Sequence, residues 1–175
     1  MVSRIARGGA DFGLCGSDRF GEGDSGGLVF EKIRDLPCRF ALLGRAGETL
    51  PDKMTVATSF PNGLQKFMVE ENLRLAETIV VNGKAESYPA TGETNAAFDI
   101  VETGASAQAN NLEIARLAAT PITLGGLWGR QVRDADSGEA VEGTWSNGQF
   151  FPMSDQYYSG KTPTVDYGLL EIERD

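Results

Sequence analysis

The sequence predicts an α/β fold with a mostly parallel sheet, followed by an irregular, β-rich C-terminal tail. Over residues 1–125, short apolar stretches rich in β-branched residues alternate with turns and helix-like stretches, as in α/β proteins. Over residues 126–175 the chain is rich in glycine, serine and aromatic residues and has no 3.6-residue period. We therefore expect an α/β region over 1–125 and a separate tail over 126–175.

The first predicted elements alternate between strands and turns. Residues 10–18 form a short apolar strand that ends in Gly-Ser-Asp, a sequence that stops strands and can cap a helix. A glycine-rich loop at 21–27 precedes a buried strand at 36–45. A turn at 51–53 then leads to a β-branched strand at 54–60.

A helix is predicted over residues 61–73, directly after that strand. Pro61 suits its first turn. Four apolar side chains share one face of this helix at 3.6-residue spacing: Leu64, Phe67, Met68 and Leu73. This strand–helix pair favours a parallel sheet, because a crossover helix is the usual connection between parallel strands.

Further strands are predicted at 76–83 and 97–104, whereas the stretch YPATGETNAA between them is ambiguous. A helix is expected in ASAQANNL, followed by a strand that begins at Leu112 and continues into irregular chain. The tail should form several short strands or hairpins, with DSG and SNG as turns. Its aromatic residues could build a satellite core, an oligomer contact or a stacking surface for a ligand: Trp128, Trp145, Phe150, Phe151, Tyr157 and Tyr158.

Charge and composition exclude several classes of function. With 16 basic and 25 acidic side chains, the formal net charge of −9 argues against general affinity for nucleic acid or an anionic membrane. The charge does not exclude a local pocket for a phosphorylated metabolite, because backbone amides can bind a phosphate without basic side chains. No apolar run is long enough to span a bilayer, and the start has no signal-peptide core. Together with Cys15 and Cys38, which we interpret as buried thiols, this predicts a cytoplasmic protein.

The pentapeptide Gly-Asp-Ser-Gly-Gly around Ser25 matches the surroundings of a protease nucleophile, but it does not predict a hydrolase. A serine hydroxyl needs a positioned base, usually histidine, and the chain contains no histidine. Nothing indicates that Lys32 is desolvated enough to replace it. We interpret the segment as a glycine-rich connecting loop.

The most informative segment is FDIVETGASAQANN, residues 98–111. An apolar strand delivers Asp99 and Glu102, and the chain then turns into a helix whose first amides have no intrahelical partner. Gly104 permits close approach of a ligand, while Thr103 and Ser106 add hydroxyl donors.

Two interpretations of this segment remain open on its own residues. It could cradle a phosphate at the helix start, with Asp99 and Glu102 accepting hydrogen bonds from ribose hydroxyls or helping to hold magnesium. It could equally be a helix cap, in which the acidic side chains only complement the helix dipole.

Five segments, in order along the chain, resemble motifs of the ATP phosphoribosyltransferase family, which catalyses the first step of histidine biosynthesis. DIVETGASAQANNL resembles its phosphoribosyl-diphosphate loop, D-x-V-x-T-G-x-T-x-x-x-N-x-L, with Ser106 in place of the second threonine. The other four segments are GGADFGLCGSD, CRF, VATSFPNGLQKFM and NGKAESYP. The resemblance covers residues 8 to about 124.

The resemblance implies periplasmic-binding-protein-like lobes, with the second lobe at about 54–124. The first lobe would be incomplete, because the family's usual amino-terminal Lys-Gly-Arg segment, which helps bind ATP, has no counterpart. The implied reaction joins N1 of ATP to 5-phosphoribosyl 1-diphosphate, with magnesium as cofactor and release of pyrophosphate. A homo-oligomer or a partner subunit would complete the cleft. The alternative is a non-catalytic phosphosugar-binding or regulatory module.

Carried over by position, the resemblance gives each candidate residue a role. The amides of Gly104, Ala105 and Ser106, with the Thr103 and Ser106 hydroxyls, would hold the 5-phosphate. Asp99 would bind the ribose hydroxyls or magnesium, with Glu102 beside it. Three further candidates would lie on the diphosphate side of the cleft: Asp18, Glu86 and Arg39. Arg39 would neutralise a leaving phosphate, or else form a structural salt bridge at a strand end.

Overall fold

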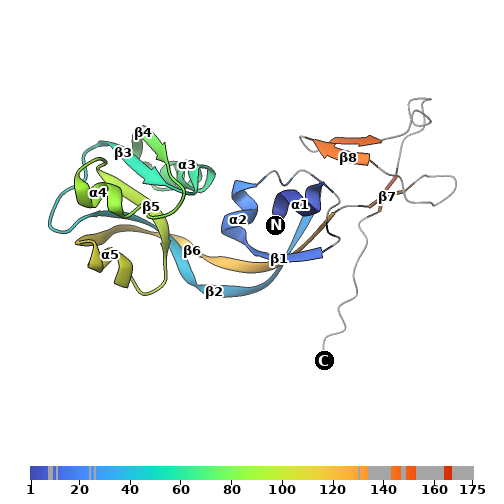
Figure 1. Ribbon diagram of the computed structural model, residues 1–175, viewed down its shortest axis with the longest axis horizontal. Helices are drawn as coiled ribbons and strands as arrows, with labels where there is room; N and C mark the ends of the chain where they lie inside the picture. The colour runs from blue at the N-terminus through green and yellow to red at the C-terminus, as the bar shows by residue number, and fades with distance from the viewer. Residues whose placement is uncertain are drawn as a thin grey trace. The chain divides into compact units, whose positions relative to one another are not determined.

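The computed structural model describes residues 1–7, 10, 12–23, 25 and 27–129, and beyond these the backbone of four short strands. The chain divides into two compact units (Figure 1). Unit 1 comprises Met1–Cys15, Gly23–Lys32 and Gly125–Asp175; unit 2 comprises Gly16–Glu22 and Ile33–Leu124. Unit 2 therefore contains the predicted second lobe together with segments that precede it in the sequence.

The described helices are short, whereas two of the strands are long. The five helices described are α1 (Val2–Ala6), α2 (Ser17–Glu22), α3 (Pro61–Glu70), α4 (Ser87–Thr91) and α5 (Ala105–Ala109). The strands up to Gly129 are β1 (Phe12–Gly16), β2 (Leu28–Arg45), β3 (Lys53–Thr58), β4 (Arg74–Val80), β5 (Ala96–Val101) and β6 (Leu112–Gly129). The later strands are β7 (Gln131–Arg133), β8 (Gly143–Ser146), β9 (Gln149–Pro152) and β10 (Thr164–Asp166).

Strands β1 to β6 form one mixed sheet in the order β1-β6-β2-β5-β3-β4. Strand β3 runs parallel to both β4 and β5, whereas β2 runs antiparallel to β5. The prediction of an α/β fold is confirmed. Its parallel part is the β4-β3-β5 segment, which is built from the strand–helix alternation that the sequence displays.

Helix α3 ends three residues earlier than predicted, because Asn72 adopts a left-handed conformation with φ 52. The amide of Leu73 donates to the Met68 carbonyl at 2.9 Å, and that of Asn72 donates to Val69 at 3.2 Å. These two bonds form a Schellman cap, which reverses the chain. Leu73 still packs on the core below α3, but from beyond the end of the helix.

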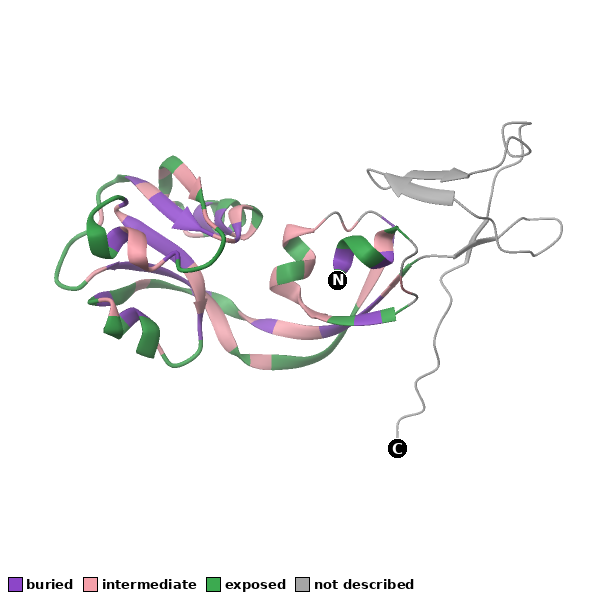
Figure 2. Cartoon of the chain, viewed as in Figure 1, coloured by how far each residue is buried: buried purple, intermediate pink, exposed green. Residues whose placement is uncertain are grey.

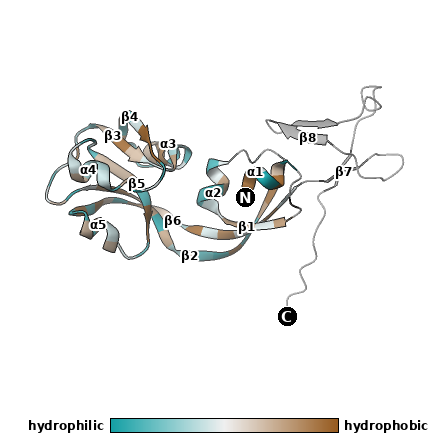
Figure 3. Cartoon of the chain, viewed as in Figure 1, coloured by the Kyte–Doolittle hydropathy of each residue, from teal (hydrophilic) through white to brown (hydrophobic). Residues whose placement is uncertain are grey.

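Strands β2 and β6 are each 18 residues long, so the predicted strand at 36–45 was too short and the predicted irregular chain after Leu112 was wrong. The middle of β2, residues 31–35, is exposed and hydrophilic (Figures 2 and 3). A strand segment without a buried face carries no alternating apolar pattern, which is why the sequence did not reveal it. The ambiguous stretch after residue 87 contains α4, which ends at Gly92 with φ 85.

The core of unit 2 lies on both faces of the parallel strands. One cluster packs under α3, where the Phe98 ring stacks 4.8 Å from that of Phe40 and lies 5.1 Å from that of Phe67. The cluster on the other face packs under α4 and α5 and consists of Ala41, Leu43, Ala57, Ala85, Ala97, Val101, Ala107 and Leu112. Because side chains alternate along a strand, this arrangement places Asp99, between Ala97 and Val101, on the α4–α5 face of β5.

In unit 1, Val2 and Ile5 of α1 are buried, and the Phe12 ring stacks on Trp128 with centroids 6.3 Å apart. Trp128 thus packs against another aromatic side chain of its own unit. The other five tail aromatics lie outside the residues whose side chains are described.

The expectation of short strands and hairpins in the tail is confirmed. Strands β8 and β9 pair antiparallel, with Ser146 opposite Gln149, and the two residues between them, in the predicted SNG turn, lie outside the described residues. Strands β7 and β10 also pair antiparallel. The predicted DSG turn lies outside the described residues. Within the described chain, no helix has both the length and the apolar character needed to cross a membrane.

Candidate functional site

The carboxyl ends of β3, β4 and β5 meet at one edge of the sheet, since the three strands are parallel. From this edge β3 connects through α3 to β4, whereas β5 connects through α5 to β6 on the other side. Helices α3 and α5 pack on opposite faces. The connections therefore diverge between β3 and β5, and open α/β sheets bind ligands at such a point of divergence.

Two hydroxyl groups hold the three strand ends together. The Thr58 hydroxyl donates to the Phe98 carbonyl at 2.8 Å and accepts from the Phe60 amide at 2.9 Å. The Ser59 hydroxyl donates to the Val81 carbonyl at 2.9 Å. These bonds link β3 to both of its neighbours where the main-chain ladders end, so the loops that follow start from a fixed position.

The predicted phosphate loop follows β5 at this edge. Gly104 has φ 77 and ψ 4, a left-handed conformation that favours glycine, and it is the N-cap of α5. The side chains of Thr103 and Ser106 are exposed, while Ala107 is buried and fixes α5 to the sheet. The Asn110 side chain donates to the Ser106 carbonyl at 2.9 Å, a contact that sequence reasoning missed.

Asp99 is half-buried at the carboxyl end of β5 and accepts a hydrogen bond from the Ile100 amide at 2.8 Å. Burial raises the pKa of Asp99, and the nearby charge of Glu86 raises it further. The Ile100 hydrogen bond and the charge of Arg19 lower the same pKa but do not offset the burial. The charges of two residues distant in the sequence, Glu86 and Arg19, therefore act on Asp99, and the sequence did not reveal the one from Arg19.

Replacing Asp99 with asparagine should leave unit 2 at least as stable as wild type at neutral pH. A carboxyl whose pKa is raised in the folded state favours folding fully below its unfolded pKa, which is close to the ordinary value of 3.8. This contribution is lost as the pH rises through the folded pKa. The advantage of Asp99→Asn should therefore shrink as the pH falls. Urea denaturation at several pH values measures this, with the exposed Asp52→Asn as control. A lower stability of Asp99→Asn at neutral pH would contradict this assignment.

Asp18 and Glu102 lie near a common neighbour, Cys38 on β2. The pKa of the Cys38 thiol is raised, first by burial and then by the charges of Asp18 and Glu102. The Asp18 side chain is only 11% exposed. The charges of both carboxylates therefore act on this thiol, which is partly buried and not fully buried as the sequence suggested.

Arg39 does not point into open solvent at a strand end. Its guanidinium donates to the carbonyl oxygens of Ala118, at 3.2 Å, and Ala119, so the side chain joins β2 to β6. This is a structural contact, although it is made to carbonyls and not to the carboxylate of a salt bridge.

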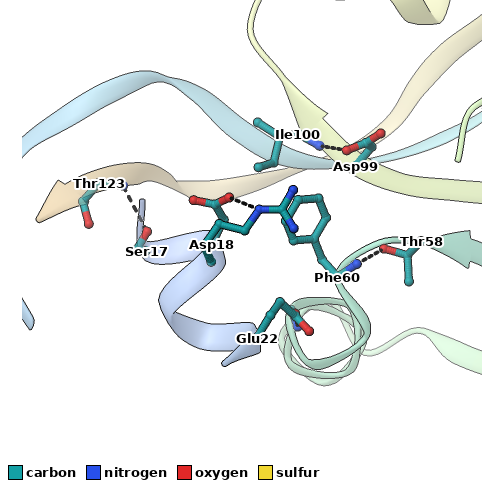
Figure 4. A network of polar contacts seen from close by, with 10 residues as sticks. Ser17, Asp18, Glu22, Thr58, Phe60, Asp99, Ile100 and Thr123 are labelled. Carbon is teal, nitrogen blue, oxygen red and sulfur yellow. Dashed lines mark hydrogen bonds and ion pairs between the residues drawn. The ribbon is translucent and has the colours of Figure 1, made fainter. Parts of the chain in front are cut away.

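Helix α2 lies against the start of α3 and supplies two functional candidates that sequence reasoning missed, Arg19 and Glu22. The guanidinium of Arg19 lies 3.8 Å from Asp18 and 4.8 Å from the centre of the Phe60 ring. Figure 4 shows Asp18, Phe60 and Asp99 grouped where α2 meets the ends of β3 and β5. A signal existed in the spacing of Asp18 and Glu22, four residues apart and so on one side of a short helix.

No group of three or more histidine, cysteine, aspartate or glutamate side chains is placed to hold a metal ion within the described part of the chain. The four acidic candidates therefore do not form a cage by themselves. Magnesium seldom needs one, because it is commonly held by one or two carboxylates together with the phosphates of a substrate.

The fold is that of a periplasmic-binding-protein-like α/β domain, in which the carboxyl ends of the parallel strands meet at one edge of the sheet. A sensor domain of a histidine kinase with similarity to periplasmic binding proteins shares this fold, with a TM-score of 0.52 at 14% identity over 74% of this chain and 60% of that one. The chain belongs to the ATP phosphoribosyltransferase (HisG) family, whose sequence profile matches residues 1–122.

Individual relatives agree with the family assignment. The ATP phosphoribosyltransferase of Clostridioides difficile is 36% identical over 120 residues, which are 65% of this chain and 56% of the relative. That of Azobacteroides pseudotrichonymphae is 32% identical over 114 residues, 62% of this chain and 40% of the relative. The chain thus spans about half the length of these relatives. The ATP phosphoribosyltransferase (HisG:HisZ) complex of Thermotoga maritima matches with a TM-score of 0.62 and 27% identity, over 73% of this chain and 63% of that one.

Proposed function

We propose that this chain carries the phosphoribosyl-diphosphate site of an ATP phosphoribosyltransferase. In the reaction, N1 of ATP attacks the anomeric carbon of 5-phosphoribosyl 1-diphosphate, and pyrophosphate leaves. One observation carries the proposal: in a member of this family, Asp99 and the Gly104 loop lie together where the connections of β3 and β5 diverge.

In this proposal the 5-phosphate binds at the start of α5. The amides of Gly104, Ala105 and Ser106 donate to it, and the hydroxyls of Thr103 and Ser106 add further donors. The left-handed conformation of Gly104 supports this role, because it turns the chain so that successive amides converge on one point. Asp99, with Glu102 beside it, accepts hydrogen bonds from the ribose hydroxyls.

We infer that magnesium arrives on the diphosphate of the substrate. The donor set fits this inference, since Asp99 and Glu86 offer oxygen ligands but the described residues provide no complete cage. When bound, magnesium would neutralise charge on the departing pyrophosphate. Asp18 and Glu86 are its further candidate neighbours on the diphosphate side.

Adenine N1 is unprotonated at neutral pH, so the attack needs no general base. A chain without histidine is suited to such a reaction, in which the protein orients two substrates and stabilises departing charge. Orientation of this kind can lower a barrier by on the order of 7–11 kcal/mol. Because both substrates are intracellular metabolites, the proposal places the reaction in the cytoplasm.

We further propose that the working enzyme is an assembly. The related structure from Thermotoga maritima is a complex of HisG and HisZ. By analogy, a second copy of this chain or a partner subunit would complete the cleft and help to bind ATP.

The proposed activity predicts pyrophosphate release only when ATP, phosphoribosyl diphosphate and Mg²⁺ are all present. Asp99→Asn should lower the rate by on the order of a hundredfold or more, because hydrogen bonds that orient the ribose are lost. The control is Asp52→Asn, which makes the same change at the exposed amino end of β3. A coupled pyrophosphate assay on the chain, alone and with a candidate partner subunit, measures both. Saturable binding of phosphoribosyl diphosphate without turnover, both for the chain alone and with the partner, would support a phosphosugar-binding module and contradict the proposed enzyme activity.

A further inference from the structure

The proposed crevice carries an excess of negative charge. Asp99 and Glu102 lie at and just beyond the carboxyl end of β5. The charge of Glu86 acts on Asp99, and the charges of Asp18 and Glu102 both act on Cys38. A phosphoribosyl diphosphate is itself strongly anionic. Binding it there requires positive charge on the protein side in addition to any that magnesium brings.

Four basic side chains of unit 2 contact other groups of the protein. Arg39 is held by carbonyls of β6, Arg45 by Glu48, Lys66 by Glu70 and Arg74 by Asp52. Arg19 also has a carboxylate neighbour, Asp18, but it differs from these four because its guanidinium lies over the Phe60 ring beyond the carboxyl end of β3 and its charge acts on Asp99.

Helix α2, which carries Arg19, is fixed at both ends within unit 2. At its start, the Thr123 amide donates to the Ser17 hydroxyl at 3.0 Å. At its end, the Glu22 carboxylate accepts from the amides of Asn62, at 3.1 Å, and Gly63, at 2.6 Å. These amides belong to the first turn of α3, so Glu22 caps that helix and anchors α2 to it (Figure 4).

The guanidinium of Arg19 is pre-positioned by this helix. The Phe60 ring supports its face at 4.8 Å, and Asp18 lies 3.8 Å from its Nε atom. Phe60 is buried in the core and lies two residues beyond the carboxyl end of β3. A planar guanidinium held this way loses little side-chain entropy when it binds a ligand and can donate two parallel hydrogen bonds to a phosphate.

We propose that Arg19 binds the diphosphate of the phosphoribosyl substrate, and that Phe60, Asp18 and the two anchors of α2 position it. This inference rests on the proposed function. The sequence analysis gave the role of neutralising the leaving group to Arg39, but Arg39 donates to a carbonyl of β6. The inference gives that role to Arg19 of α2, which the family resemblance did not single out.

Calorimetric titration in Mg²⁺ with two probes tests the inference: phosphoribosyl diphosphate, and ribose 5-phosphate, which lacks the diphosphate. Arg19→Gln should weaken binding of phosphoribosyl diphosphate by roughly tenfold to hundredfold, as expected for loss of charge-assisted hydrogen bonds. Its affinity for ribose 5-phosphate should stay within about twofold of wild type, because the 5-phosphate site at α5 is unchanged. Arg19→Lys, which keeps the charge but loses the planar fork, should recover part of the loss.

Arg74→Gln is the matched control, because it removes an exposed guanidinium of the same charge at the amino end of β4 and should bind both probes as wild type does. Unchanged binding of phosphoribosyl diphosphate by Arg19→Gln would overturn the inference alone. Equal weakening of both probes would also overturn it, since a structural role predicts that result. If wild type binds neither probe, the proposed function itself fails, and the inference falls with it.

Discussion

Replacing Phe98 with alanine should lower the free energy of unfolding by about 3–5 kcal/mol, the usual loss for a large aromatic side chain removed from a packed core. Phe98 has no exposed surface, and its ring contacts those of Phe40 and Phe67. The residue next to it is Asp99, so a cavity at this position also frees the strand end that carries the site. Urea denaturation followed by fluorescence and circular dichroism measures the loss.

Val69→Ala is the control for that experiment. Val69 belongs to α3, the helix that packs on the Phe98 cluster, but its own side chain is 78% exposed. Its truncation should change stability by no more than about 0.5 kcal/mol. A loss below about 1 kcal/mol for Phe98→Ala would contradict the placement of β5 at the centre of this core.

Replacing Gly104 with valine should reduce affinity for phosphoribosyl diphosphate by on the order of a hundredfold, because two charge-assisted hydrogen bonds worth about 1.5 kcal/mol each are lost. At φ 77 a β-branched residue is strained, and the loop relaxes away from the shape in which its amides converge. Stability should fall by about 1–2 kcal/mol from the same strain. Calorimetric titration and urea denaturation measure the two effects separately.

Gly47 offers a close match for this test. It has φ 76, and a β-carbon built there meets no other atom within 4 Å, but it lies in the turn after β2, near the amino end of β5. Gly47→Val should therefore cost similar stability while leaving affinity unchanged. A loss of affinity at Gly47→Val, or none at Gly104→Val, would count against a phosphate site at α5.

Local sequence predicted those parts of the fold in which one face of an element is buried. Leu64, Phe67 and Met68 indicated α3 correctly, because their spacing reflects a helix packed on a core. Leu73 misled the prediction, since it packs on the same core from beyond the cap at Asn72. The exposed middle of β2 gave no signal, because neither of its faces is buried.

The candidate site likewise has a part that local sequence predicted and a part that it could not predict. Asp99, Gly104 and the residues between them are neighbours in the sequence, so a strand followed by a turn was enough to predict their arrangement. The position of Arg19 over Phe60 depends instead on the packing of α2 against α3. This packing includes the contact between Glu22 and Asn62, which are some forty residues apart in the sequence. Periodicity cannot reveal such a contact, and it could not show that carbonyls of β6 engage Arg39.

A titration of the isotope-labelled chain with phosphoribosyl diphosphate in Mg²⁺, followed by backbone amide NMR, tests the central claim most directly. The account predicts saturable shifts at the amides of Gly104, Ala105 and Ser106, with further shifts around Asp99 and Arg19. A cavity of about 440 Å³ at the opposite, amino ends of the strands, lined in part by Leu50, Asn72, Arg74 and Arg116, provides the internal comparison. Shifts confined to that cavity, or no saturable shifts in the folded protein, would contradict a phosphoribosyl site at the carboxyl ends of β3 and β5.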